Sequence, residues 1–330
     1  MSEYLSDYNY ELPPELVASR PTERREGSRM LVLHRASGRV EHRLFKDLPE
    51  YLTSEDLLVL NDSKVLPARI HDVSGKIEIL LVKKQDERHW VAMVKPGRKM
   101  RPGSVVTVGD VEIRVEEILP DGMRLLALSQ SLDLERWGEM PIPSYFRRDA
   151  DERDRERYQS VFARDPGSVA APTAGLHFTK EILQRLPHVF LTLHVGPGTF
   201  LPVKTENVAE HTMHREEYEI EEESALRLNQ FYDSPKKGRL IAVGTTTTRV
   251  LESQPEGPIL AHAGTTNIFI RPPHQFQRVD ALLTNFHFPK STLLMLISAL
   301  AGREQILDVY RMAVEERYRF YSYGDCMLIL

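Results

Sequence analysis

Residues 169–203 read VAAPTAGLHFTKEILQRLPHVFLTLHVGPGTFLPV, and this stretch decides how we interpret the fold. Two loops of small residues, 172–175 and 196–198, flank a helical pattern at 180–186 and a strand pattern at 189–195. Glycine lets a backbone approach a ligand closely, and proline stiffens a loop. Neither loop matches a motif of known mechanism, so spacing alone also allows two ordinary turns.

Each of these loops adjoins a histidine and carries a threonine. His177 follows the first loop and His194 precedes the second, while Thr173 and Thr199 add hydroxyl groups. Rigid loops that carry titratable and polar side chains on regular elements are common positions for binding and catalytic sites. Because histidines on loops seldom support core packing, we expect replacement of His177 to leave the protein folded. The alternative interpretation is two packed histidines without a role in chemistry.

Composition is that of a globular protein. The chain has 330 residues, of which 41% are hydrophobic and 28% are charged, and this length suffices for two domains. No apolar run is long enough to span a bilayer, and the acidic first residues do not resemble a signal peptide. Cys326 is the single cysteine, which excludes an internal disulfide and a cysteine-based zinc site. We therefore expect a cytoplasmic protein without a membrane partner.

Residues 66–145 differ in character from their surroundings. Short alternating runs at this spacing, separated by turn pairs such as Ser74-Gly75 and Asp121-Gly122, predict a small antiparallel barrel or sandwich. The predicted strands are 76–82, 89–94, 105–108, 111–118 and 123–127. Because helical patterns flank this region on both sides, we interpret it as a β domain inserted into an α/β host made of residues 1–65 and 146–330.

The host alternates between strands and helices after residue 169. This alternation favours a mostly parallel sheet or barrel whose loops gather at one end. Strands are predicted at 189–195, 240–243, 268–270 and 280–283, and helices at 180–186, 224–232, 291–301 and 306–317. Three polar loops, 196–199, 244–249 and 284–289, each follow a predicted strand. Since ligands in such folds bind at the carboxyl ends of strands, we expect these loops to form one site.

The densest titratable cluster is Glu210-His211-Thr-Met-His214-Arg-Glu-Glu217. Two histidines three residues apart can share a helix face, which suggests a metal site or acid–base chemistry near neutral pH. The pattern is not His-Glu-x-x-His, and an ordinary polar helix start gives the same sequence. A Gly-x-Ser-x-Gly elbow, a P-loop and a dinucleotide fingerprint are all missing from the sequence.

Several longer stretches resemble one known family, the S-adenosylmethionine:tRNA ribosyltransferase-isomerases of queuosine biosynthesis. The most specific are PTAGLHFT at 172–179, TNFHFPKSTLL at 284–294 and YRFYSYGD at 318–325. Further matches are YELPPELVASRP, DLLVLNDSKVLPAR, TLHVGPGTFLPV, EHTMHREEYEI and AVGTTTTRVLES. Together the matching stretches cover most of the chain outside the predicted β insertion.

The resemblance implies a fold and a reaction. The fold is multidomain mixed α/β, with a large α/β barrel-like domain and an inserted small antiparallel β-barrel domain. In the reaction, the ribosyl group of S-adenosylmethionine is transferred to 7-aminomethyl-7-deazaguanine at the tRNA wobble position and isomerised. The products are epoxyqueuosine-tRNA, adenine and methionine. The sulfonium supplies the electrophilic activation, so no metal is implied, and we expect a monomer with tRNA and S-adenosylmethionine as partners.

This chemistry requires a base beside the sulfonium, an acid for the leaving adenine and donors for the methionine carboxylate. The candidates for proton transfer are His177, His194, Glu210, His211, His214, His287 and Asp325. The candidates for binding S-adenosylmethionine are Thr173, Gly175, Gly196, Gly198, Thr199, Gly244, Thr245, Thr246, Arg249 and Asn285.

Four cations lie close together in the β insertion and are candidates for contact with nucleic acid. They are Lys95, Arg98, Lys99 and Arg101. Turn residues around them should project the side chains from the barrel rim, although such a run is as often a solvated face. Because the net charge is −5, tRNA needs a local positive surface.

Two other classes of protein remain open at this point. A pure RNA-binding module would use the β insertion and its basic loop, but binding alone does not require so many proton carriers at strand ends. A metal-dependent hydrolase built on His211 and His214 is the second alternative.

Overall fold

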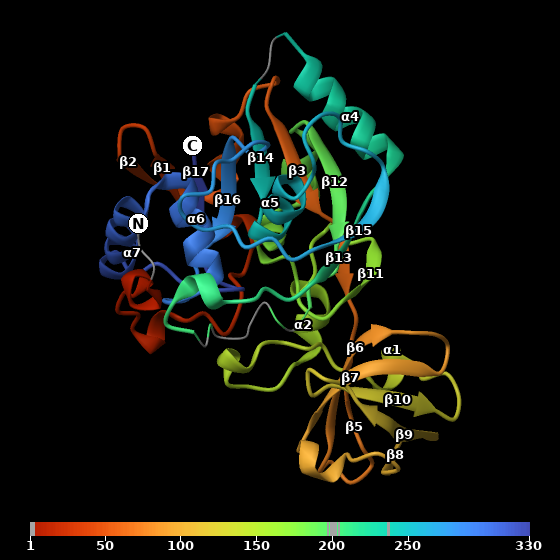
Figure 1. Ribbon diagram of the computed structural model, residues 1–330. Helices are drawn as coiled ribbons and strands as arrows, with labels where there is room; N and C mark the ends of the chain where they lie inside the picture. The colour runs from red at the N-terminus through yellow and green to blue at the C-terminus, as the bar shows by residue number, and fades with distance from the viewer. Residues whose placement is uncertain (1–3, 197, 199–202, 204, 236–237) are drawn as a thin grey trace.

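The computed structural model describes residues 4–196, 198, 203, 205–235 and 238–330. Its largest feature is a nine-stranded sheet in the order β15-β13-β12-β3-β14-β16-β17-β1-β2 (Figure 1). The strands are β1 (Arg29–His34), β2 (Arg39–Leu44), β3 (Leu57–Asn61), β12 (His188–Leu193), β13 (Glu216–Ile220), β14 (Leu240–Val243), β15 (His262–Thr266), β16 (Ala281–Asn285) and β17 (Cys326–Ile329).

The centre of this sheet is parallel. β12, β3, β14 and β16 pair in parallel register, for example Ile241 with Ala281 and Leu282 with Ala242. β17 runs antiparallel to β16, and β1 pairs with β17 in parallel. β13 and β15 on one side and β2 on the other complete the sheet in antiparallel register. Because β12, β3, β14 and β16 run the same way, their carboxyl ends lie at one edge of the sheet, as the sequence predicted.

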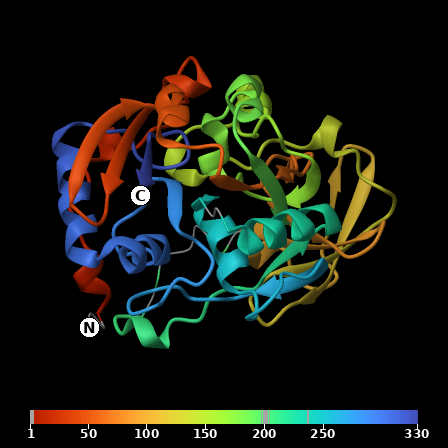
Figure 2. The ribbon, with the colours of Figure 1, turned by 90° about the horizontal axis from the view of Figure 1, so that it is seen from above.

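Helices cover both faces of the sheet. The α-helices among the described residues are α1 (Leu134–Trp137), α2 (Glu152–Arg157), α3 (Lys180–Gln184), α4 (Glu222–Asp233), α5 (Thr245–Glu252), α6 (Thr292–Ala301) and α7 (Arg303–Glu315), and those that cover this sheet are α3 to α7. Helices α4 to α7 lie on one face, and α3 with the 3₁₀ helix η4 (Phe45–Tyr51) lies on the other (Figure 2). Ser291 caps α6 by accepting the Leu294 N–H at 3.2 Å. None of the described helices is long and apolar enough to cross a bilayer.

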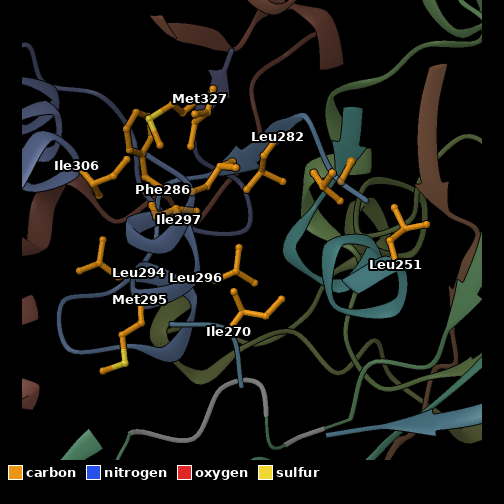
Figure 3. Packing of buried hydrophobic residues seen from close by; sticks show 14 of the residues in the cluster. Leu251, Ile270, Leu282, Phe286, Leu294, Met295, Leu296, Ile297, Ile306 and Met327 are labelled. Carbon is orange, nitrogen blue, oxygen red and sulfur yellow. The ribbon is translucent and has the colours of Figure 1, made fainter. Parts of the chain in front are cut away.

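The central strands are apolar on both sides, which is the pattern of a sheet buried between two layers. On β3, Leu57 and Val59 belong to the core beneath α4 to α7, while Leu58 and Leu60 belong to the opposite core. Figure 3 shows the first core, where Leu282 and Phe286 pack against side chains of α6. Full burial of one such side chain stabilises the fold by about 1.5–3 kcal/mol.

A six-stranded antiparallel sheet lies beside the main sheet (Figure 1). Its strands, in spatial order, are β5 (Arg69–His71), β6 (Glu78–Lys84), β7 (His89–Lys95), β10 (Arg124–Leu128), β9 (Val111–Ile118) and β8 (Val105–Val108). The N–H of Val73 donates to the Thr107 carbonyl at 2.9 Å, which brings the two edges together and nearly closes the barrel. The mixed α/β class with a small antiparallel barrel is therefore confirmed. The predicted domain boundaries at 65/66 and 145/146 stay predictions.

Several local predictions were wrong. Residues 268–270 form no strand, and the edge strand is instead β15 at 262–266. Strand β5 was missed because it has only three residues. Residues 211–215 form no helix, so His211 and His214 do not share a helix face. Residues 211–215 lie between a 3₁₀ helix at 208–210 and β13, and their sequence contains no periodicity that distinguishes an extended segment from a helix.

Gly138 ends α1 where the barrel returns to the host. A Cβ at this position would lie 1.8 Å from the carbonyl oxygen of Pro67, which is backbone and cannot move aside cheaply. The Gly138 carbonyl also accepts a hydrogen bond from Arg155 at 2.8 Å. The close approach of two backbones therefore depends on the missing side chain.

We predict that Gly138→Ala lowers the free energy of unfolding by about 1–3 kcal/mol, the usual cost of overpacking. The matched control is Gly27→Ala, because a Cβ there would meet only Arg24 at an ordinary 3.8 Å. Urea denaturation of the two variants measures the difference. Equal stabilities would show that the contact between Gly138 and Pro67 is not a constraint on the fold.

Candidate active site

A cavity of about 500 Å³ lies at the carboxyl ends of β14 and β16, and we call it the strand-end cavity. Its wall includes the loop after each of these strands, the 3₁₀ helix η7 (Thr173–His177) and a group of aromatic side chains. The aromatic members are Tyr145, Phe286, Phe288 and Tyr321. The cavity forms because two parallel neighbours end together and the chain must turn away from both of them.

Five of the predicted binding residues line this cavity. They are Thr173, Gly244, Thr245, Thr246 and Asn285. Gly244 has φ +94°, a conformation that favours glycine, and it lets the chain turn directly from β14 into α5. The buried Thr246 hydroxyl finds no hydrogen-bond partner among the described residues. It lies in the first turn of α5, so a polar ligand group in the cavity would meet both the hydroxyl and free backbone N–H groups.

His287 is the predicted proton carrier that lines the strand-end cavity. Its backbone is fixed by Tyr310, whose hydroxyl accepts the His287 N–H at 3.0 Å, and by a hydrogen bond from the Tyr10 hydroxyl to its carbonyl. The Nε2 atom lies 2.9 Å from the Thr284 hydroxyl. Burial lowers the pKa of His287 to about 3, so the imidazole is neutral at pH 7. A neutral ring can accept a proton from a ligand but cannot donate one as imidazolium.

His177 lies one layer behind the cavity. Its Nδ1 atom is 2.7 Å from the Ser28 hydroxyl, and its Nε2 atom is 3.4 Å from the Asn285 side-chain oxygen. The ring stacks on Phe45, and burial lowers its pKa to about 4. The expectation that this histidine carries no core packing was wrong, because η7 turns the side chain inward. His177 is not part of the cavity wall, and its hydrogen bond to Asn285 connects it to that wall.

A second cavity, of about 750 Å³, lies between α5, residues 211–216 and the barrel, and we call it the barrel-side cavity. Its wall includes His211, His214, Gly196, Gly198 and Arg249 from the predicted set. It shares Leu293 with the strand-end cavity, so the two cavities are neighbours.

The two histidines of the barrel-side cavity differ in their surroundings. The His214 ring lies so close to Gly198 that a Cβ there would meet it at 2.5 Å. The His211 ring packs edge-on against Phe269 at 5.4 Å between ring centroids. Burial, with a smaller effect from His214, lowers the pKa of His211. His211 is therefore mainly neutral near pH 7 and supplies little fixed charge.

His194 lies in a third cavity, of about 870 Å³, which Gly196 also lines. The His194 Nε2 atom is 3.7 Å from the Asp165 carboxylate. Val195 belongs to the walls of both this cavity and the strand-end cavity. The predicted histidines are thus distributed over neighbouring cavities and do not converge on one point.

Three predicted residues lie away from these cavities. The Asp325 carboxylate is buried and accepts the backbone N–H groups of Arg29 and Arg319, each at 2.8 Å, which gives it a structural task. Gly175 packs against Phe162, where a Cβ would approach within 2.8 Å. Glu210 is exposed in a short 3₁₀ helix. Thr199, also predicted, lies outside the described residues.

Two polar residues are notable among those that line the cavities and that the sequence prediction missed. Tyr321 adopts φ +72°, which is uncommon for a tyrosine, and its carbonyl accepts the Asn285 side-chain N–H at 2.9 Å. Its buried hydroxyl finds no partner among the described residues. The segment YRFYSYGD contained this residue, but nothing in the pattern separated it from its neighbouring tyrosines. Glu216, the second, lies within the predicted titratable cluster but was not among the predicted site residues, and it forms a buried ion pair with Arg249.

The four barrel cations are exposed, as expected, and they surround the 3₁₀ helix η5 (Gly97–Lys99) at the end of β7. The Arg124 side chain donates to the carbonyls of both Gly97 and Gly122. Gly122 lines the barrel-side cavity, so the basic segment lies near the rim of that cavity. No ion pair involves these cations within the part of the chain that the structure describes.

The described residues hold no cluster of three or more His, Cys, Asp or Glu side chains arranged to bind a metal. His211 and His214 consequently have no further ligand of these types beside them within the described ranges.

The fold and these cavities define an α/β protein with an inserted barrel and a concave site at the strand ends. A family profile described as queuosine biosynthesis protein matches residues 5–329, and the chain belongs to this family. Two similar proteins are named S-adenosylmethionine:tRNA ribosyltransferase-isomerase. The one from Desulfitobacterium hafniense is 47% identical, and the one from Symbiobacterium thermophilum is 48% identical, each over 99% of both chains.

A solved structure is similar over the same extent. The crystal structure of S-adenosylmethionine tRNA ribosyltransferase from Thermotoga maritima matches with a TM-score of 0.57 at 38% identity. The match covers 98% of this chain and all of the other chain.

Burial of His177 and His287 makes stability depend on pH. Both pKa values are lower in the folded protein, about 4 and about 3, than the ordinary 6.5. The unfolded chain therefore binds more protons, and stability present above pH 6.5 is lost as the pH falls towards 4. Each histidine should lower the free energy of unfolding by about 1–2 kcal/mol when the pH falls from 7 to 5.

The measurement is urea denaturation at pH 7 and pH 5 for the wild type and for the double variant His177→Gln, His287→Gln. We expect the double variant to lose less stability on acidification. His71→Gln, a partly exposed barrel histidine, is the control and should behave as the wild type. Equal pH dependence in all three proteins would contradict burial of neutral histidines.

Proposed function

We propose that this protein is an S-adenosylmethionine:tRNA ribosyltransferase-isomerase. It transfers and isomerises the ribosyl group of S-adenosylmethionine onto 7-aminomethyl-7-deazaguanine at the tRNA wobble position, giving epoxyqueuosine-tRNA, adenine and methionine. The observation that carries the proposal is the family match over residues 5–329, together with relatives of this name that align over the whole chain. A cavity at the strand ends, of a size suited to a small ligand, supports it.

The strand-end cavity offers suitable surroundings for the adenosine part of the substrate. The rings of Phe288, Tyr321 and Tyr145 provide an apolar wall on which a purine can pack. Thr246 and the first turn of α5 provide donors for polar atoms in another part of the wall. The cavity thus offers one surface to the purine ring and another to the polar groups of the substrate.

His287 is our candidate for the base that removes a proton from the carbon beside the sulfonium. When Nε2 carries the ring hydrogen and donates to Thr284, the Nδ1 atom presents its lone pair. Burial keeps this lone pair free at neutral pH, because the lowered pKa disfavours the imidazolium. His177 then acts as a positioning residue through Asn285.

The proposed reaction also indicates the metal requirement and the compartment that we expect for the protein. The sulfonium already activates the neighbouring carbon, so the proposal needs no metal. We propose a monomer that acts in the cytoplasm, where tRNA is found and where the buried thiol of Cys326 stays reduced.

The test is adenine release from S-adenosylmethionine in the presence of tRNA carrying 7-aminomethyl-7-deazaguanine. We expect release with this tRNA and none with tRNA carrying guanine at the same position. His287→Gln should lower turnover by at least about a hundredfold, the usual scale of acid–base loss. His34→Gln is the control, because His34 ends β1 at the opposite edge of the sheet. Normal turnover in His287→Gln would remove this histidine from the chemistry, and absence of release in the wild type would refute the function.

The barrel cations are our candidate docking surface for tRNA. Cations that contact phosphates release counterions, with a salt slope of roughly −0.7 to −0.9 per contact. The quadruple alanine variant of Lys95, Arg98, Lys99 and Arg101 should raise the tRNA dissociation constant and flatten its salt dependence. S-adenosylmethionine binding should be unchanged. Superimposable salt series for variant and wild type would place the tRNA on another surface.

A further inference from the structure

Arg249 and Glu216 form an ion pair in the wall of the barrel-side cavity. Arg249 lies in α5 and Glu216 begins β13, and their side chains are only 3% and 4% exposed. The pair links the helix that lines the strand-end cavity to the segment that carries His211 and His214. Burial of two charges is costly, and a pair of this kind is weak evidence for stability alone.

The guanidinium of Arg249 keeps unused hydrogen-bonding capacity. Its Nη1 atom contacts Glu216, whereas Nε and Nη2 have no hydrogen-bond partner among the residues that the structure describes. A buried donor on a charged group is costly to leave unpaired. Nε and Nη2 form one edge of the planar guanidinium, and such an edge binds a carboxylate through two parallel hydrogen bonds. The free edge therefore fits a ligand with a planar anionic group.

The proposed reaction contains two kinds of anion, the carboxylate of the methionyl group and the phosphates of tRNA. The Glu216 carboxylate beside Arg249 repels a phosphate, which carries no compensating positive charge. An α-amino acid group carries an ammonium beside its carboxylate, and this pair of charges complements the Arg249–Glu216 pair. The neighbouring His211 is mainly neutral because burial lowers its pKa, and Arg215 in the same wall is exposed, so Arg249 supplies the buried positive charge.

We infer that Arg249 binds the carboxylate and Glu216 the α-ammonium group of the methionyl part of S-adenosylmethionine. The inference rests on the proposed function and adds a placement to it. The methionyl group occupies the barrel-side cavity, and the adenosine occupies the strand-end cavity. Leu293, which lines both cavities, marks the boundary between them.

The test compares S-adenosylmethionine with decarboxylated S-adenosylmethionine by isothermal titration calorimetry. Wild-type protein should bind the decarboxylated compound at least about tenfold more weakly, because a charged hydrogen bond is lost. Arg249→Lys keeps a positive charge for Glu216 but loses the two-donor edge. It should weaken S-adenosylmethionine binding by a similar factor and leave binding of the decarboxylated compound unchanged, so the two ligands become nearly equal.

The matched control is Arg215→Lys, which changes an exposed arginine in the wall of the same cavity and should keep the wild-type preference. If Arg249→Lys does not fold, the double variant Arg249→Gln, Glu216→Gln removes both charges together and should lose the same preference. An unchanged preference in a folded Arg249 variant overturns the inference, as does a loss confined to tRNA affinity. If the wild-type protein releases adenine but binds both compounds equally well, the inference is wrong and the proposed function stands. Absence of adenine release refutes the proposed function.

Discussion

The parallel pairing of β3, β14 and β16 is the constraint on which the rest of this structure depends. Both faces of these strands are buried, so their register is fixed by two hydrophobic cores at once. Parallel neighbours cannot be joined by tight turns, and each strand must leave the sheet at the same edge through a longer connection. The strand-end cavity is a consequence of this requirement, because the segments after β14 and β16 diverge there.

Burial has opposite effects on the polar groups around this edge. Asp325 is satisfied by two backbone donors and fixes the approach of the last strand to the first. His177 and His287 are held neutral, and their hydrogen bonds orient Asn285 and the loop after β16. Thr246 and Arg249 instead keep unpaired donors beside open space within the described part of the chain. The satisfied groups hold the site in its shape. The unpaired donors indicate where a ligand can accept hydrogen bonds.

The barrel extends the site without sharing the main core. Its own interior contains Ile79, Val115 and Leu126, and its outer loops reach the wall of the barrel-side cavity. A net-acidic chain thereby presents exposed cations near a cavity whose inner wall contains a balanced ion pair. Charge is thus arranged by depth, with exposed cations outside and a buried guanidinium paired with a carboxylate inside. Such an arrangement suits a long anionic polymer that presents one small reacting group to an interior site.

The sequence by itself determined the fold class, the inserted antiparallel barrel and the strands that lead to the site. Periodicity and turn residues are local, so β14 at 240–243 and the helix that starts after Ser291 could be predicted from neighbouring residues. Only the tertiary structure decided which polar residues line a cavity. Asp325 and His177 have the same residue types as a catalytic group, but distant segments bury them and take their hydrogen bonds. The pairing of Glu216 with Arg249 joins positions far apart in the sequence, and no local pattern encodes such a contact.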